Sequence, residues 1–215
     1  GGTVEYNKVD NALSGIQIQP YHSGSSGSVN NNEFNIYSQG IYYNYANTTT
    51  ATDALWTITD NVNTVATNPV WENLSYDGGP RAWQAIRVET FRESSTHSNI
   101  QGVTFDNNTS NGAGASVEGG WTAVQGVYFR NIKGVASENI TKIQFTDNTF
   151  TNVEVGVQFI ETGTMEFELN PLFANGNSYP TGMVVYEPYQ IGCAHVSNLT
   201  QGIGYATIQP AITAA

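Results

Sequence analysis

The sequence predicts an all-β fold: a right-handed parallel β-helix (β-solenoid) of about eight to nine turns with irregular loop insertions. Three observations predict it. Charged residues are only 12% of the 215-residue chain, whereas Asn, Thr, Ser and Gly are abundant, and this composition disfavours helices. Apolar and polar residues alternate in short runs between Asn- and Gly-rich corners, as they do in strands. Finally, one pattern recurs without gaps.

The recurring pattern is Asn, any residue, apolar, any two, apolar, any two, Gly, apolar, any, apolar. Its copies span 7–18, 32–43 and 148–159. The first two start 25 residues apart (32 − 7), which suits one turn of a solenoid. The predicted corner positions are Asn7, Asn32 and Asn148, then Gly15, Gly40 and Gly156. Asn tolerates left-handed backbone angles and can form a ladder with the Asn one turn away, and we expect positive φ at the glycines.

Weaker copies predict that turns continue through the middle of the chain. The stretches 58–61, 105–108 and 129–135 resemble 145–148, whereas 46–67 and 110–122 match poorly and are predicted loops. A β-sandwich or jelly roll also has short strands with frequent turns, but it does not require Asn and Gly in one gapless register. We expect a β-helix over 1–192 and a linker with a cap-like segment over 193–215.

These motifs resemble those of the right-handed parallel β-helix proteins, a group that includes pectate lyases, pectin methylesterases, phage tailspikes and bacterial surface adhesins. The resemblance covers nearly the whole chain, but its motifs belong to the scaffold, so it implies a fold and not an activity. The C-terminal stretch 204–215 resembles the capping segment with which many such β-helices begin. It implies the start of a following β-helix or a contact to a neighbouring copy, with a disordered tail as the alternative.

Charge and hydrophobicity exclude some classes of binding partner. The net charge is −11 and the seven basic residues are mostly scattered, so nucleic acid and anionic membranes are poor candidates. Apolar runs are short, so we expect no membrane insertion. The single cysteine permits no internal disulfide. The start at Gly1 without Met suggests a processed product or a segment of something longer.

No catalytic constellation is found, so we expect no catalytic residues, no cofactor and no enzyme activity. The basic stretch 81–87 lacks the Arg-x-Pro-x-x-Arg spacing of pectate lyases, and no adjacent pair of carboxylates suits acid–base chemistry. Acidic residues recur at the predicted corners, at Asp10, Asp60, Asp106 and Asp147. They could line a calcium site, although solvent-exposed corners are the favoured interpretation. The histidines His22, His97 and His195 are far apart, and His195 with Cys193 supplies too few ligands for zinc. We therefore expect no metal site.

Aromatic residues are candidate sugar-stacking sites, and glycosylation sequons are candidate glycan attachment sites. Sugars could stack on an exposed subset of Tyr42, Tyr43, Tyr45, Trp71, Trp83 and Trp121, although strand alternation places either Tyr42 or Tyr43 inward. The six Asn-x-Ser/Thr sequons would accept glycans in a host that glycosylates. They are Asn47, Asn73, Asn107, Asn108, Asn139 and Asn198.

Two functional hypotheses follow. The first is a non-catalytic structural or adhesive module of an extracellular or cell-surface protein, stacked head to tail with copies of itself or with adjacent β-helix repeats, because unpaired strand edges invite pairing. The predicted assembly contacts are Val4, Tyr6, Tyr205, Ile208 and Ile212. The alternative is a carbohydrate-active protein, either a polysaccharide-binding module or a diverged lyase-like enzyme.

Overall fold

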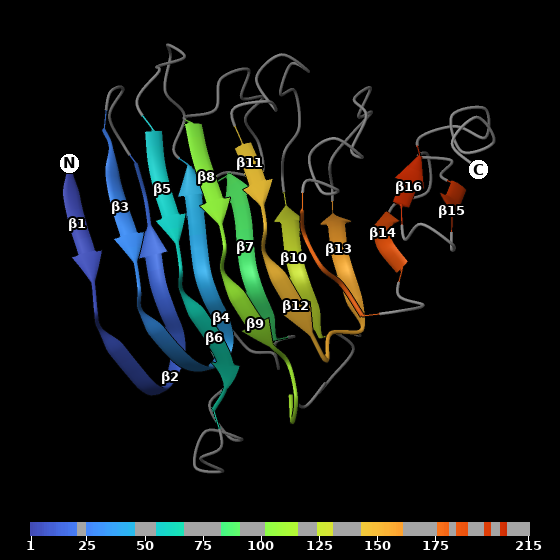
Figure 1. The fold of residues 1–215 in the computed structure, drawn as a ribbon, viewed down its shortest axis with the longest axis horizontal. Helices are drawn as coiled ribbons and strands as arrows, with labels where there is room; N and C mark the ends of the chain where they lie inside the picture. The colour runs from blue at the N-terminus through green and yellow to red at the C-terminus, as the bar shows by residue number, and fades with distance from the viewer. Residues whose placement is uncertain are drawn as a thin grey trace.

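The computed structural model describes residues 1–20, 25–45, 55–66, 83–90, 102–115, 124–130, 143–160, 176–180, 184–188, 196–198 and 203–205. Within these ranges the chain is all β, with strands and turns but no helix (Figure 1). In this part of the chain, therefore, no helix is long and apolar enough to cross a membrane.

The strands in chain order are β1 (Gly2–Glu5), β2 (Lys8–Ile18), β3 (Gly27–Asn30), β4 (Glu33–Tyr45), β5 (Leu55–Thr59), β6 (Val62–Val65), β7 (Gln84–Thr90), β8 (Gly102–Asp106), β9 (Thr109–Asn111), β10 (Gln125–Arg130), β11 (Ile143–Thr146), β12 (Thr149–Thr151), β13 (Val155–Ile160), β14 (Val184–Pro188), β15 (Val196–Asn198) and β16 (Ile203–Tyr205).

Parallel strands stack in three columns, which we call the first, second and third faces. The first face is the sheet β1-β3-β5-β8-β11. The long strand β4 bends, so that Glu33–Ile36 pairs with β6 while Gln39–Tyr45 pairs with β7. The second face therefore holds β6, β9 and β12, and the third holds β7, β10, β13 and β14. Strand β2 pairs with β4 along both of these faces.

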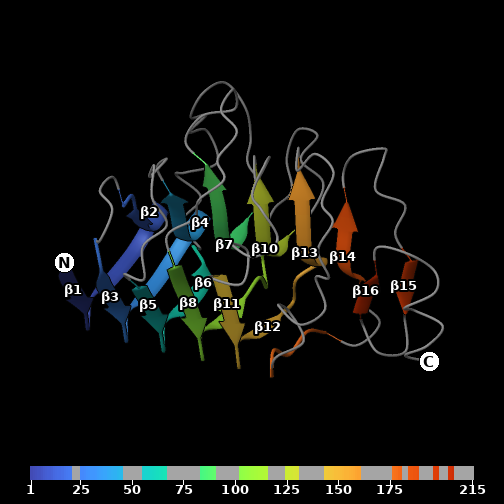
Figure 2. The same ribbon diagram turned by 90° about the horizontal axis from the view of Figure 1, so that it is seen from above.

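The chain visits the three faces in the same order again and again, for example β8, then β9, then β10 (Figures 1 and 2). All pairs on these faces are parallel, and β15 and β16 form a separate antiparallel pair. This arrangement is compatible with a parallel β-solenoid.

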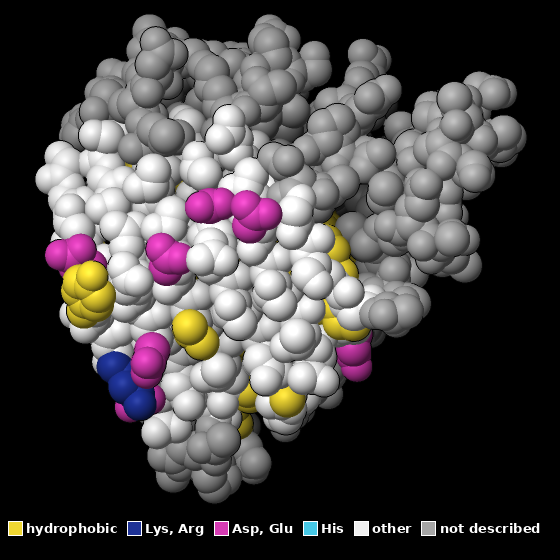
Figure 3. Space-filling view, in the orientation of Figure 1, with side chains coloured by type: hydrophobic (Ala, Val, Ile, Leu, Met, Phe, Trp, Pro, Cys, Tyr) yellow, Lys and Arg dark blue, Asp and Glu magenta, His cyan; other side chains and the backbone are white. Residues whose placement is uncertain are grey.

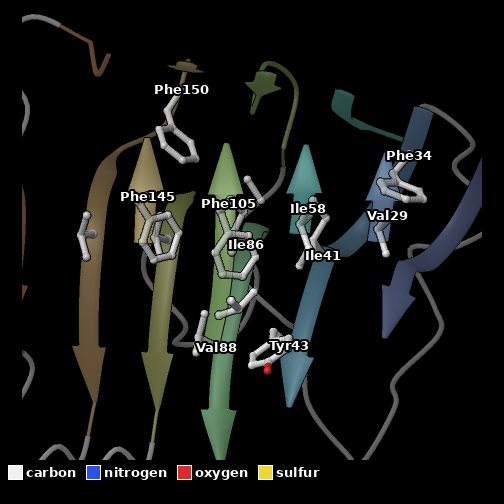
Figure 4. Packing of buried hydrophobic residues seen from close by; sticks show 14 of the residues in the cluster. Val29, Phe34, Ile41, Tyr43, Ile58, Ile86, Val88, Phe105, Phe145 and Phe150 are labelled. Carbon is white, nitrogen blue, oxygen red and sulfur yellow. The ribbon is translucent and has the colours of Figure 1, made fainter. Parts of the chain in front are cut away.

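Apolar side chains form columns in the interior because alternate residues of each strand point inward. On the first face, the strand register places four buried residues one above another: Val29, Ile58, Phe105 and Phe145 (Figure 4). The rings of Phe105 and Phe145 are stacked, with centroids 4.7 Å apart and planes 9° apart. The apolar periodicity of the sequence thus becomes a continuous core.

Three expectations about individual segments need correction. Residues 55–65, expected to belong to a loop, form β5 and β6, and Thr109–Asn111 form β9. The stretch beginning at Phe129 is not equivalent to that at Phe145, because Phe129 lies in β10 of the third face and pairs with Val88 and Phe159. Apolar alternation shows that a segment is a strand, but it does not say which face the strand joins.

Candidate functional site

A ladder of asparagines follows the corner between the first and second faces. In each step, the backbone N–H and the Nδ2 of one Asn donate to the Oδ1 of the next, with all distances between 2.9 and 3.1 Å. The described rungs are Asn7, Asn32, Asn61, Asn108, Asn148 and Asn177. The structure thus joins the three predicted ladder residues through rungs from the weaker repeats.

The number of residues between successive rungs gives the length of each turn. Successive rungs are 25, 29, 47, 40 and 29 residues apart. Among the six rungs within the described residues, four of the five spacings exceed the 25 residues that separate the first two rungs. The variation has a simple cause, because segments inserted between strands lengthen a turn without changing the stacking of its corner.

The left-handed corner residue is the one before each rung, not the ladder Asn that we expected. These residues have φ between 50° and 73°, and they are Tyr6, Asn31, Asp60, Asn107, Asp147 and Gly176. Asn, Asp and Gly enter the left-handed region at least cost, and they occupy five of the six positions. The sharp turn directs the next side chain inward, and Asn32, Asn61, Asn108 and Asn148 are accordingly buried.

Strand register places Gly15, Gly40 and Gly156 in one column of the third face, but these glycines serve a different purpose from the one expected. Among the described glycines only Gly114 and Gly176 have positive φ, so Gly15, Gly40 and Gly156 do not. A Cβ on Gly40 would lie 2.6 Å from the carbonyl oxygen of Ala85 and would also overlap the side chain of Asn63. Glycine is present because the neighbouring turn leaves no room for a side chain.

The N-terminal end of the stack is exposed. Among the described strands, β1 pairs only with β3, and β2 only with β4. Val4 is 38% exposed, and Tyr6 is 76% exposed. Of the other predicted assembly residues, Tyr205 lies in β16 at the opposite end (Figure 1), and Ile208 and Ile212 lie outside the described residues.

A charged cluster occupies the outer side of the third face. Strand register aligns Tyr42 of β4, Arg87 of β7 and Tyr128 of β10. Arg87 Nε donates to Glu89 Oε2 at 2.9 Å, and Arg87 Nη2 contacts the same oxygen. The Tyr42 hydroxyl donates to Glu89 Oε1. The guanidinium carbon lies 5.0 Å from the Tyr42 ring centroid and 5.4 Å from that of Tyr128.

This third-face cluster is largely withdrawn from water. The side chains of Arg87 and Glu89 are 12% and 11% exposed, respectively, and Tyr128 is buried. Opposite charges and two aromatic faces offset the cost of burying the guanidinium. Asn44 donates from Nδ2 to the Tyr42 hydroxyl at 3.0 Å, while its buried Oδ1 has no hydrogen-bond partner. The cluster therefore combines aromatic faces, a cation, an anion and one unused acceptor.

The recurring acids do not converge on one point. Asp60 accepts from Asn107 Nδ2 at 2.6 Å, Asp106 accepts from the Thr146 hydroxyl, and Asp10 forms a 3.5 Å ion pair with Lys8. Asp147 belongs to the left-handed corner and lies against Gly176. The described residues include no group of three or more His, Cys, Asp or Glu able to hold a metal ion. The three histidines and Cys193 lie outside the described residues.

The predicted aromatic and glycosylation residues lie partly in the core, partly on the outer surface and partly outside the described residues. Tyr43 and Trp83 are buried in the core, whereas Tyr42 points outward; burial raises the pKa of the Tyr43 hydroxyl. Trp71, Trp121, Asn47, Asn73 and Asn139 lie outside the described residues. Tyr45 lies in β4 and Asn198 in β15.

The overlapping sequons at Asn107 and Asn108 have opposite environments. Asn107 is exposed, but Asn108 is fully buried and its Nδ2 donates to Asn148 Oδ1 and to the Ile58 carbonyl, both at 2.9 Å. A glycan would be attached through that nitrogen, so a glycan at Asn108 is incompatible with this fold. The sequon pattern alone carries no information on burial.

Sequence reasoning did not single out Asn177, and it named Tyr42 as a candidate aromatic residue without connecting it to Arg87, Glu89 or Tyr128. Asn177 begins the repeat pattern with Tyr179 two positions on, but Gly182 stands where the pattern has an apolar residue and Val185 where it has Gly. Arg87 and Glu89 are two charges at alternate positions of a strand in a chain with few charges, which is a weak signal for a common outer face. A scan of protein-family models and searches of curated proteins and of solved structures found no match.

Proposed function

We propose that the chain is a right-handed parallel β-helix that serves as a non-catalytic structural or adhesive module of an extracellular or cell-surface protein. The observation that carries the proposal is the continuous Asn ladder, whose buried rungs are hydrogen-bonded to one another. Right-handed connections between parallel strands are strongly favoured, which supports the predicted hand. The recurring residues then act as a rigid scaffold.

The outer surface of the first face suits this role. It consists mainly of uncharged polar groups with a few acidic side chains (Figure 3). Its outward residues include Thr3, Ser28, Thr57, Thr59, Thr104 and Thr146. Hydroxyl groups keep such a strand-rich surface hydrated at low charge, as an extended extracellular module requires.

Small-angle scattering and a degradation assay together test the proposal. We expect an elongated particle, and no new reducing ends or unsaturated uronides from a panel of neutral and acidic polysaccharides. Turnover by the wild-type chain that is lost in both Tyr42→Phe and Arg87→Met would contradict a non-catalytic role. The exposed substitution Val62→Lys is a matched control, because Val62 lies on the second face.

The third-face cluster favours a second candidate function, a polysaccharide-binding module. Tyr42, partly exposed on the outer side of this face, offers an aromatic side chain to a sugar, and Arg87 holds that ring and the Glu89 carboxylate in place. A glycan array with the wild type and Arg87→Met tests it, with retained folding checked by circular dichroism. Glycan signals that disappear in the variant would support binding, and the absence of any signal would reject it.

A further inference from the structure

The Asn ladder and the apolar columns hold the turns together, but they do not distinguish one turn from another. Every step of the ladder repeats the same two donations to the same type of acceptor atom. On the first face, successive turns likewise supply one buried apolar side chain each, such as Ile58, Phe105 or Phe145. These repeated contacts alone would allow one turn to be left out of the stack.

A skipped turn is the simplest error of this kind. We call the turn with β5, β6 and β7 the third turn, that with β8, β9 and β10 the fourth, and that with β11, β12 and β13 the fifth. If the fifth turn stacked directly on the third, Asn61 would meet Asn148 across 87 residues (148 − 61). The native partner Asn108 is 47 residues away. Closing a loop of about twice the length costs little more entropy, so chain length does not prevent this error.

Two buried polar pairs in the interior make the third and fourth turns unlike the others. On the second face, Asn63 Nδ2 donates to Ser110 Oγ at 3.0 Å. On the third face, Gln84 Nε2 donates to Gln125 Oε1 at 2.8 Å. Each of the four side chains is at most 4% exposed. Both pairs therefore join the third turn to the fourth through contacts that the repeat pattern does not supply.

The fifth turn has apolar side chains at the same positions. Strand register places Phe150, labelled in Figure 4, next to Ser110, and Val155 next to Gln125. In a stack without the fourth turn, Phe150 and Val155 would face the two amides of the third turn. Both amides would then lose their hydrogen-bonded partners inside the core, and buried polar groups without partners are costly.

Side-chain volume opposes the same error. A Cβ on Gly126 would lie 3.1 Å from Cδ1 of Phe150, so the ring uses the space that the glycine leaves. In the third turn, the position equivalent to Gly126 is the buried Ala85. Phe150 placed on the third turn would therefore press against the Ala85 side chain, and such overpacking is destabilising.

We propose that the two interior polar pairs determine the stacking order of the turns, so that the ladder supplies stability and the pairs specify which turn follows which. This inference goes beyond the proposed function, because it concerns how the coil reaches one arrangement whatever it binds. The pairs are not arranged for maximal stability, since Asn63 Oδ1 and Gln84 Oε1 have no hydrogen-bond partner among the described residues. Buried polar groups also specify one arrangement at a cost in stability in coiled coils.

Disulfide trapping during refolding measures the stacking order. Thr57, Thr104 and Gln144 lie in one register across β5, β8 and β11 of the first face. Neighbouring strands are about 4.8 Å apart, which suits a disulfide, whereas strands two turns apart exceed the limit of about 7 Å between Cα atoms. Thr57→Cys with Thr104→Cys therefore reports the native order, and Thr57→Cys with Gln144→Cys reports a skipped fourth turn. Every chain also carries Cys193→Ser, which removes the single native thiol.

The two polar pairs are replaced separately by apolar side chains of similar size. Gln84→Met with Gln125→Met preserves the side-chain shape, and Asn63→Leu with Ser110→Ala removes the other pair. Circular dichroism checks that each variant folds, and either pair alone is sufficient for the test. When oxidant is added early in refolding, we expect the disulfide of the skipped order to increase at least about tenfold over the wild-type interior.

Ile58→Ala is the matched control. It lowers stability in the same turn but removes no polar pair, and Ile58 meets an apolar side chain in either order. The disulfide of the skipped order should therefore stay at the wild-type level. An equal amount of this disulfide in the wild type and in the pair variants would overturn the proposal. An increase in Ile58→Ala as large as in the pair variants would also overturn it, because general instability would then explain the error.

Discussion

Replacing one buried ladder residue tests the role of the ladder most directly. In Asn108→Ala, the Asn61 backbone N–H loses its acceptor, which lies 3.1 Å away, and the Asn61 Nδ2 loses one of its acceptors. The donations from Asn108 Nδ2 to Asn148 Oδ1 and to the Ile58 carbonyl also disappear. Water cannot easily replace these partners, because Asn61, Asn108 and Asn148 are fully buried.

The magnitude follows from these losses. A buried donor left without a partner costs about 1–3 kcal/mol, and each hydrogen bond lost costs about 1 kcal/mol. Asn108→Ala should therefore lower the free energy of unfolding by about 3–5 kcal/mol. Asn7→Ala is the matched control, because it removes the same side chain from the exposed first rung. There water can replace the lost partners, and we expect a cost of at most about 1 kcal/mol.

Urea unfolding followed by circular dichroism measures both variants against the wild type. Equal slopes against urea concentration would show that the variants expose the same surface on unfolding. A difference below about 0.5 kcal/mol between Asn108→Ala and Asn7→Ala would refute the argument, because burial of the rung would then have no energetic consequence.

Three further predictions concern other parts of the fold. Gly40→Ala should lower the melting temperature by several degrees, because its Cβ would overlap neighbouring atoms, whereas Gly2→Ala, with no atom within 4 Å of the added Cβ, should leave it unchanged. Arg87→Met should destabilise the fold by about 3–5 kcal/mol in urea unfolding because it removes the guanidinium that pairs with the buried Glu89 carboxylate. Adding Glu89→Gln should recover part of the loss, and no recovery would contradict this explanation. Asn108→Asp should make stability pH-dependent. Burial and the facing oxygens of Asn148 and Ile58 raise the pKa of the introduced carboxyl in the folded state. Stability is therefore greatest below the carboxyl's unfolded pKa of about 4, and it falls as the pH rises through the folded pKa. A flat pH profile relative to the wild type would contradict that prediction.

The strand pattern was predictable where it depends on neighbouring residues. The alternation of inward and outward side chains is a property of any strand, so the sequence around 145–150 indicates which residues enter the core. The equivalence of Gly15 and Gly40 was also predictable, because an unbroken 25-residue spacing brings them to adjacent turns. The all-β class follows from the same local information.

The sequence alone thus determined the strand periodicity and the equivalent Asn and Gly positions of the shortest turns. The tertiary structure decided which turns stack where long segments intervene, as with Asn61 and Asn108, which are 47 residues apart. It also showed that Gly40 is required for space and not for positive φ, and it brought Tyr42, Arg87 and Tyr128 together from three strands. The reason is physical: side-chain direction is set by the local backbone, whereas stacking depends on contacts between residues far apart in the chain.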